Sequence, residues 1–427
     1  MTNPHSSDTD PPTDVKRPGA FAALQRANFR WLLLGTTLSN GAQWIQQVTL
    51  SWLIYELTGS GTMLGSLNLV RSVATLGLAT IAGVIIDRVA RRTLMSAVNA
   101  WLFVISTALG LALLSGFTAL WPLFVFTFLG GLAQAIDLPL RQTVVFVLVP
   151  RALASGAVAL VQTGWALMRS LGPALGGMLI LWLGPGGNFL VQAGAYALIT
   201  FTILRIRFPA EPSTKAQSSV RGAFREGLQY VLTQRRTRAF LLMGWVLPLF
   251  IIPIFAALPP IYAKDVFQGG PQVLGALLSA VGVGGVAGGF ATAALDHVER
   301  RGVLQLTALL LLSLSLIGFA LSPNLLIALP LLALAGFFEM IYLTTNQTLL
   351  QLSIPDELRG RVTGIVTLSS GLIPVGSLIA GIGADLIGPR AITLALAGVA
   401  LLIAIVVAAA SPTIRDYRMS EALATGA

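Results

Sequence analysis

Long apolar runs without charge constrain this chain more than any other feature of its sequence. The run from Ala391 to Ala410 contains no charged side chain, and about 20 mostly apolar residues let a helix cross the hydrocarbon core of a bilayer. The chain is 55% hydrophobic and 10% charged, whereas soluble domains carry roughly 25% charged residues. A soluble fold has no interior for so much apolar surface. The sequence therefore predicts an all-α integral membrane protein.

The apolar runs predict twelve transmembrane helices in two six-helix pseudo-repeats. A basic connection near residues 208–238 divides the runs into six and six. We expect a disordered cytoplasmic tail at 1–27, a six-helix bundle at 28–207, a cytoplasmic linker at 208–237, a second bundle at 238–411 and a tail at 412–427. The predicted spans are 29–54, 63–86, 94–114, 119–147, 155–182, 188–207, 238–261, 271–294, 302–321, 325–350, 362–385 and 390–410.

Basic residues predict the orientation of these spans. Of the 27 Lys and Arg residues, 23 are assigned to one side, Lys264 and Arg390 to the other, and Arg71 and Arg169 to the interior of spans. Basic residues accumulate on the cytoplasmic side of membrane proteins. Both termini are therefore predicted to be cytoplasmic, and the positive charge of the chain indicates membrane topology rather than nucleic-acid binding.

A charged segment recurs after the second span of each half. The order acid, three residues, Arg, Arg begins at Asp87 and again at Asp296, an offset of 209 residues. We interpret the segment as a gate in which Asp87 meets a helix N-terminus or an Arg of the other half when the cytoplasmic side closes. The alternative is a simple topological anchor. The candidate gating residues are Gly83, Asp87, Arg88, Arg91, Arg92, Asp296, Arg300 and Arg301.

Polar residues inside several spans share one helix face. They are spaced at i, i+3 and i+7, and lipid cannot satisfy their hydrogen bonds. They must therefore line a watery cavity or bond another helix. The candidate cavity residues are Asn40, Gln43, Gln47, Gln162, Trp165, Arg169, Tyr342 and Asn346.

Two acidic residues are candidates for proton coupling. Glu339 lies near the middle of its span, where both of its protonation states become accessible if a cavity opens alternately to the two sides. The alternative is an ion pair between Glu339 and Arg169. Asp137 is the second candidate, although Arg141 lies one turn away on the same helix face and could simply pair with it.

Small residues and prolines mark positions where helices bend or approach closely. The segment Gly172, Pro173, Gly176 and Gly177 is a predicted helix bend, with close packing as the alternative for its glycines. Four prolines, Pro248, Pro253, Pro259 and Pro260, interrupt the seventh span. Glycines between Gly282 and Gly289 favour close contact of the eighth span with a neighbouring helix.

The residues give no indication of an enzyme. His5 and His297 are the only histidines, and cysteine is absent. The sequence contains no catalytic triad, no metal-ligand motif and no phosphate-binding G-x-x-x-x-G-K-[ST] loop. We therefore expect no cofactor, no metal and no direct use of ATP.

Three segments resemble the major facilitator superfamily, and within it the branch of drug and siderophore exporters that includes the enterobactin exporter. They are Asn28 to Arg30 with Ser51 to Ser60; Gly83 to Arg92, in which Ala90 replaces a usual Gly; and Asp137 to Gln142 with Arg169 to Gly177. The resemblance implies gating by Asp87 and Arg88. It also implies proton antiport, because the Gly172 to Gly177 segment is similar to the end of an antiporter motif.

Residues and resemblance together predict a secondary transporter of the bacterial inner membrane. We expect a monomer that exports a small organic molecule by alternating access in exchange for protons. Uptake by symport or facilitated diffusion is the alternative within transport, and a membrane scaffold without transport is the alternative outside it.

The predicted orientation can be tested by cysteine labelling, because the native chain has no cysteine. A cysteine at Arg225, in the basic connection, should react with a membrane-impermeant maleimide only after the cells are opened. Labelling of this cysteine in intact cells would contradict the predicted topology.

Overall fold

The structure, a computed structural model, describes residues 21–208 and 220–417. The predicted tails and linker therefore lie partly outside the described residues. Helices make up the fold, and the described residues contain no β-strand. The α-helices are α1 (Ala27–Thr58), α2 (Gly61–Arg88), α3 (Arg91–Leu114), α4 (Trp121–Leu148), α5 (Ala154–Arg205), α6 (Val220–Thr233), α7 (Arg235–Gly244), α8 (Ile252–Ala256), α9 (Pro259–Ile261), α10 (Pro271–Ala294), α11 (Arg301–Leu321), α12 (Leu325–Leu352), α13 (Asp356–Leu368), α14 (Leu372–Ile387), α15 (Pro389–Ala410) and α16 (Pro412–Arg415).

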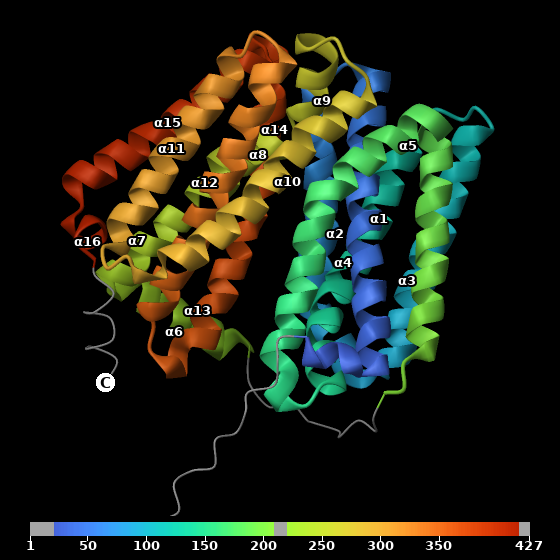
Figure 1. Ribbon diagram of the computed structural model, residues 1–427, viewed down its shortest axis with the longest axis horizontal. Helices are drawn as coiled ribbons and strands as arrows, with labels where there is room; N and C mark the ends of the chain where they lie inside the picture. Colours follow the sequence, from blue (N-terminus) through green and yellow to red (C-terminus); the bar gives the residue numbers. More distant parts are fainter. Residues whose placement is uncertain (1–20, 209–219, 418–427) are drawn as a thin grey trace, which may run out of the picture.

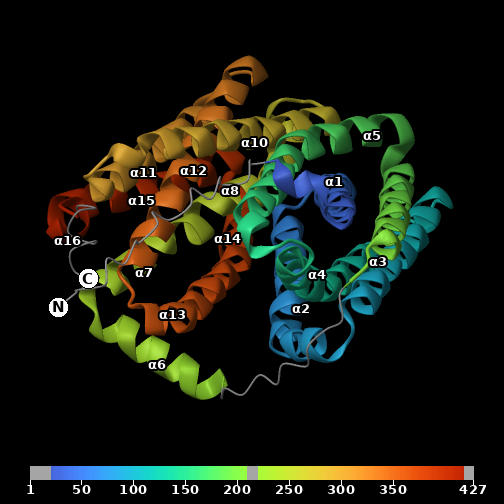
Figure 2. The ribbon, with the colours of Figure 1, turned by 60° about the horizontal axis from the view of Figure 1, so that its bottom comes forward.

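The helices form two groups that lie side by side. Helices α1 to α5 make up the first group, and α7 to α16 make up the second (Figure 1). The same division is visible after the molecule is turned (Figure 2). The short helix α6 lies against the second group, where the Tyr230 hydroxyl donates a hydrogen bond of 3.1 Å to the Ser353 carbonyl oxygen.

Eight helices of the described chain are long and apolar enough to cross a membrane, and nine if the bent α2 counts as one span. The all-α membrane fold is therefore confirmed, whereas the number twelve stays a prediction. Two predicted spans, 155–182 and 188–207, are joined in the single helix α5. Within it only Gly184 leaves the helical region, with φ 68° and ψ 174°, a conformation that glycine adopts without steric cost.

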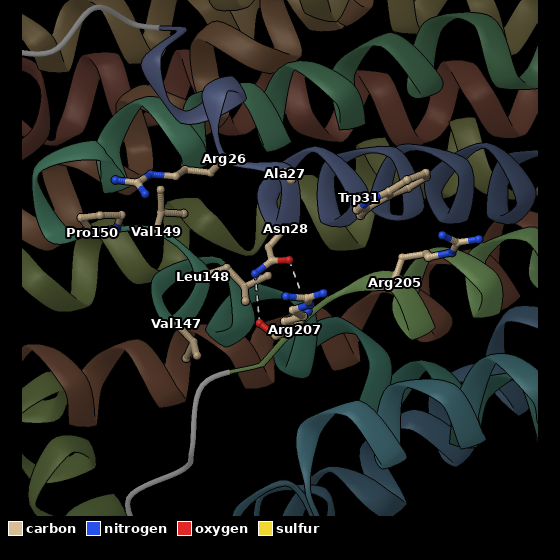
Figure 3. Close-up of a pocket in the computed structure, with 10 residues that line it drawn as sticks. All are labelled: Arg26, Ala27, Asn28, Trp31, Val147, Leu148, Val149, Pro150, Arg205 and Arg207. Carbon is tan, nitrogen blue, oxygen red and sulfur yellow. Dashed lines mark hydrogen bonds between the residues drawn. The ribbon is translucent and has the colours of Figure 1, made fainter.

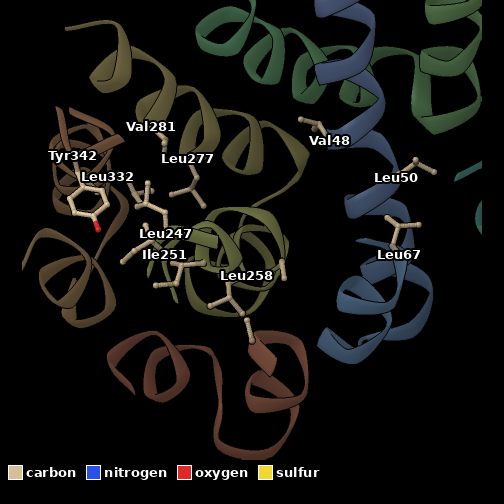
Figure 4. Packing of buried hydrophobic residues seen from close by; sticks show 14 of the residues in the cluster. Val48, Leu50, Leu67, Leu247, Ile251, Leu258, Leu277, Val281, Leu332 and Tyr342 are labelled. Atoms are coloured by element: carbon tan, nitrogen blue, oxygen red, sulfur yellow. The ribbon is translucent and has the colours of Figure 1, made fainter. Parts of the chain in front are cut away.

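Prolines break the predicted seventh span as expected. Helices α7, α8 and α9 alternate with π-helical segments at Leu247–Ile251 and Tyr262–Val266, because proline removes a backbone donor and clashes with the preceding turn. Side chains of this broken segment, including Ile251 and Leu258, are packed toward Leu277 of α10 in the apolar interior (Figure 4).

Glycines bring α10 into backbone contact with both neighbours. A Cβ atom added at Gly284 would lie 1.8 Å from the Ala333 carbonyl oxygen of α12, and one at Gly282 would lie 2.4 Å from the Arg169 carbonyl oxygen of α5. At Gly177 the added atom would lie 2.4 Å from the Pro271 carbonyl oxygen. A larger residue at these positions would force the helices apart.

The glycines of the segment Gly172 to Gly177 are packed closely against α1. A Cβ atom added at Gly172 would lie 2.6 Å from the Trp44 Cβ atom, and one at Gly176 would lie 3.2 Å from the Ile45 Cα atom. Backbone torsions stay helical through Pro173, and the chain leaves the helical region at Gly184. The helix bend at Pro173 stays a prediction.

A second close contact joins α2 of the first group to α14 of the second. A Cβ atom added at Gly61 would lie 2.6 Å from the Gly381 carbonyl oxygen, and one at Gly65 would lie 2.7 Å from the Ser377 carbonyl oxygen. These contacts lie near the beginning of α2 and in α14. The two groups therefore touch at the end of the molecule where α2 begins.

Asp385 of α14 caps the beginning of α2. Its carboxylate accepts hydrogen bonds from the Ser60 hydroxyl (2.8 Å), the Gly61 amide (2.6 Å), the Thr62 amide (2.9 Å) and the Thr62 hydroxyl (2.6 Å). Acidic groups stabilise helix N-termini because they satisfy free amides and face the positive end of the helix dipole. We call Asp385 with residues 60–62 the latch.

The latch predicts a measurable effect of Asp385→Ala. Loss of the acceptor should weaken the α2–α14 contact by about 1 kcal/mol, because the exposed carboxylate is screened by solvent. A cysteine at Ser377, which is fully buried in this contact, should then react about fivefold faster with a maleimide.

Glu56→Ala is the matched control for this measurement, because Glu56 is an exposed carboxylate near the same end of the molecule. An unchanged reaction rate in Asp385→Ala would show that the hydrogen bonds of Asp385 do not hold this end closed.

Candidate functional site

A cavity of about 380 Å³ lies between the two groups of helices. Its polar wall comes from α1, α2, α4 and α5, and most of its apolar wall comes from the second group. The lining residues are Asn40, Gln43, Trp44, Gln47, Asn68, Arg71, Gln134, Trp165, Arg169, Ile252, Phe255, Ala256, Leu278, Glu339 and Ile373. The volume suits a small organic molecule, because ligand sites occupy roughly 300–1,000 Å³.

The predicted polar face of α1 lines this cavity. Asn40, Gln43 and Gln47 all contribute to the wall, as their i, i+3, i+7 spacing predicts. Trp165 and Arg169 of α5 lie in the same wall. Their positions follow from the close packing of α5 on α1 and α10, which turns this face of α5 toward the centre.

Arg169 and Glu339 form an ion pair that joins the two groups. The Arg169 Nη2 atom lies 2.6 Å from the Glu339 Oε2 atom, with only 13% and 7% of the two side chains exposed. The guanidinium also lies over the Trp165 ring, 5.5 Å from its centroid. Each charge therefore has a partner, which a buried charge requires.

Gly285 leaves room for this pair. A Cβ atom added there would lie 3.7 Å from the Arg169 Nη1 atom, so any longer side chain at this position would extend toward the guanidinium. The glycines of α10 thus bring α5 close to α12 and also keep the space that the ion pair occupies.

Two predicted cavity residues lie elsewhere. Tyr342 is fully buried, and its hydroxyl donates a hydrogen bond of 2.6 Å to the Met243 carbonyl oxygen. The Asn346 side-chain oxygen accepts a hydrogen bond of 2.7 Å from Gln305. Both share a helix face with Glu339, but α7 and α11 cover that face beyond the cavity. In this structure both residues bond other helices and lie outside the cavity lining, so their role in the cavity stays a prediction.

Gln162 also lies outside the cavity wall, although its side chain is exposed. It precedes Trp165 by about one turn of α5, so the predicted face is correct. The cavity ends before it reaches Gln162. The sequence could not predict this end, because helix periodicity defines a face but not how far a cavity extends along it.

Asp137 pairs with Arg141 on α4. The Asp137 Oδ2 atom lies 2.7 Å from the Arg141 Nε atom, and Arg141 also donates a hydrogen bond of 3.2 Å to Asn99. The predicted i, i+4 pair is confirmed, and both residues are buried. A role of Asp137 in proton coupling stays a prediction.

Sequence reasoning assigned no cavity role to Arg71, Asn68 or Trp44, all of which line the wall. Gln134, whose polar face on α4 predicts either a cavity or a helix contact, lines the wall as well. Asn68 and Arg71 are spaced i, i+3 in the second span, which is the signal that identified α1. Arg71 donates a hydrogen bond to the Gln47 side chain. The apolar wall had no signal, because such side chains look the same whether they face lipid or a ligand.

The candidate gating residues lie at the other end of α2 from the latch. Asp87, Arg88 and Arg300 are exposed. Arg92 donates a hydrogen bond of 2.9 Å to the Leu204 carbonyl oxygen, and Arg301 is 5% exposed. Gly83 has open space where a Cβ atom would be. Arg91 is half-buried, and the side chain of Asp296 lies outside the described residues.

A pocket of about 730 Å³ opens at the surface where α1 begins (Figure 3). Arg26, Arg205 and Arg207 surround it, and the Asn28 side chain bonds the Arg207 backbone. The adjoining chain segments 1–20 and 209–219 are not described. The central cavity is the better candidate site, because both groups of helices contribute to it and the Arg169–Glu339 ion pair lies in its wall. No group of three or more potential metal ligands occurs among the described residues.

Comparison of the sequence with known proteins identifies the family of this chain. Residues 18–422 match the family described as transmembrane secretion effector. The chain is 29% identical to the multidrug efflux pump Tap of Mycolicibacterium fortuitum, over 91% of this chain and 97% of that protein. It is 27% identical to the staphyloferrin A transporter of Staphylococcus aureus, over 81% of this chain and 86% of that protein.

The fold matches a solved transporter structure. A bacterial homologue of the human lysosomal transporter Spinster, in an inward-facing and unoccupied conformation, superposes with a TM-score of 0.70 at 16% identity. The match covers 92% of this chain and 98% of that one. The chain therefore belongs to the transmembrane secretion effector family of the major facilitator superfamily, and it is a membrane transporter rather than an enzyme.

Proposed function

We propose that this protein exports a small organic molecule across the bacterial cytoplasmic membrane, in exchange for protons. The observation that carries the proposal is the Arg169–Glu339 ion pair, which lies in the wall of a cavity between the two groups of helices. A cavity at this position can open to either side if the groups rock against each other. Export, rather than uptake, is supported by relatives named as efflux pumps.

The orientation follows from the basic residues. We place both termini on the cytoplasmic side, because most Lys and Arg residues are assigned to that side. The latch then lies on the outer side and closes the cavity there. Asp87 lies on the cytoplasmic side, where its exposure supports a conformation in which this end is open. We also propose that the protein acts as a monomer of two six-helix bundles.

The gate requires Asp87 to gain a partner when the cytoplasmic side closes. In that state the carboxylate would meet a helix N-terminus or an arginine of the second group, as it would at any helix end that lacks a cap. Asp385 already makes such a contact with α2 at the opposite end. The two ends of α2 would thus be closed alternately by one carboxylate each.

Protonation of Glu339 couples this motion to the proton gradient. The ionised carboxylate attracts Arg169 across the boundary between the groups, and the neutral acid loses most of that attraction. A lone buried guanidinium is unfavourable. Protonation therefore favours separation of the groups around the cavity, which admits water to Arg169. Asp137 is a weaker candidate, since its partner Arg141 lies on the same helix.

Glu339→Gln tests this coupling, because the amide resembles the protonated acid. In proteoliposomes that contain the purified protein, we expect the variant to lose accumulation of radiolabelled 2-naphthalenesulfonate, a permanently charged organic anion, driven by a pH gradient. Exchange of this anion across the membrane without a gradient should continue, because the cavity remains.

The exposed carboxylate variant Glu56→Gln serves as the control and should transport like the parent. If Glu339→Gln still accumulates 2-naphthalenesulfonate with the pH dependence of the parent, Glu339 is only a structural partner of Arg169. Proton coupling would then have to reside in another residue. No accumulation by the parent in any gradient would contradict transport of this probe by proton exchange.

A further inference from the structure

The charges buried among the helices do not balance. Two arginines, Arg71 and Arg169, lie within spans, and Arg141 lies near the end of α4. The residues that line the two pockets beside Arg71 include only two carboxylates, Asp137 and Glu339. Asp137 pairs with Arg141, and Glu339 pairs with Arg169. Arg71 forms no ion pair with a described carboxylate, and its printed partner is the neutral amide of Gln47. The cavity wall therefore carries an excess positive charge.

Arg71 is held in place from two sides. The Thr75 hydroxyl lies 3.0 Å from the Arg71 carbonyl oxygen and 3.2 Å from the Gly131 carbonyl oxygen of α4. A Cβ atom added at Gly131 would lie 2.9 Å from the Arg71 carbonyl oxygen. Helix α2 thus lies in backbone contact with α4 here, and a site built on such a contact is fixed before any ligand arrives.

Asp137 lines a pocket together with Arg71, but its ion pair is with Arg141. Asp137 shares a small pocket of about 40 Å³ with Arg71, and its Oδ1 atom is buried without a hydrogen-bond partner among the described residues. This volume is enough for one water molecule, which needs about 10–15 Å³. Asp137 is already committed to Arg141, so one carboxylate faces two guanidinium groups. The excess positive charge remains.

The groups around Arg71 suit a negatively charged ligand. They are neutral amides, whose NH₂ groups can donate hydrogen bonds to an anion without opposing its charge. These amides belong to Asn40, Gln43, Gln47, Asn68 and Gln134. A guanidinium with its fork of N–H donors binds a carboxylate through two parallel hydrogen bonds.

The apolar side chains of the lining, which come from both groups of helices, suit an apolar body. Trp44 and Trp165 contribute aromatic rings from the first group, and Phe255, Ile252 and Leu278 contribute apolar side chains from the second. A ligand that satisfies the polar and the apolar side chains of the lining has one anionic head and an apolar or aromatic body. A purely cationic ligand would face the excess charge of Arg71.

We propose that Arg71 is the anion-binding residue of the central cavity, and that the transported molecules include amphiphilic organic anions with a carboxylate head. The proposal deepens the proposed function, on which it rests, by naming a class of substrate. A bound anion would supply the negative charge that the Arg71 guanidinium lacks. This stabilises the site, because an uncompensated charge within the membrane is costly.

Equilibrium binding to the purified protein in detergent tests this assignment. The probes are 2-naphthylacetate, 2-naphthylacetamide and 2-(2-naphthyl)ethylamine, which share one aromatic body and differ in head-group charge. Calorimetry should give a dissociation constant for the carboxylate about tenfold lower than for the amide, which corresponds to about 1.4 kcal/mol. The amine should bind more weakly than the amide.

Variants separate a charge effect from a folding defect. Arg71→Gln should bind the carboxylate and the amide with equal dissociation constants. The value for the amide should equal that of the parent protein, and this equality would show that the cavity is intact. Arg71→Lys should retain most of the preference for the carboxylate. Arg236→Gln, which removes an exposed arginine, should behave like the parent.

Two results would overturn the proposal: tighter binding of the amine than of the carboxylate by the parent, or an unchanged carboxylate preference in Arg71→Gln. Because the readout is binding, it is independent of transport. A protein that binds as expected but moves no ligand in proteoliposomes would refute the proposed transport and leave the anion site in place.

Discussion

The Arg169–Glu339 ion pair is the contact on which the centre of the molecule depends. Each ion alone would be costly at this depth, because an ion taken out of water loses several kcal/mol of solvation. Together they satisfy each other across the boundary between α5 and α12. Glycines make this geometry possible. Gly282 and Gly284 let α10 lie in backbone contact with α5 on one side and α12 on the other.

The contacts between the two groups follow the repeat of the sequence. Helix α2 occupies the position in the first half that α10 occupies in the second, and each is packed through glycines against a helix of the other group. Gly61 and Gly65 make the contact of α2 with α14, whereas Gly275 and Gly282 make that of α10 with α5. A carboxylate cap, Asp385, is added to the α2 contact. Close contacts through small residues let helices slide or separate as rigid bodies, which is what the proposed opening and closing of this boundary requires.

Much of the polar site was predictable because lipid cannot satisfy amides or charges. Asn40, Gln43 and Gln47 line the cavity for that reason, and the Asp137–Arg141 pair follows from its spacing. Tyr342 lies outside the lining, because periodicity defines a helix face but not which neighbouring helix covers it. The apolar side chains of α8 and α10 carried no signal at all. Asp385 was overlooked because a single acid at the end of an apolar run looks like a loop residue, and its partners lie far away in sequence.

Breaking the Arg169–Glu339 pair should open one end of the cavity and close the other. Spin-label distances in lipid nanodiscs measure this motion, with labels at Met63 and Leu386 near the latch and at Val84 and Gly364 near the other end. On acidification we expect the first distance to lengthen and the second to shorten, and we expect Glu339→Gln to show the acidic distances already at neutral pH. Two distances that stay constant, or that change in the same direction, would show that the pair does not control the two ends.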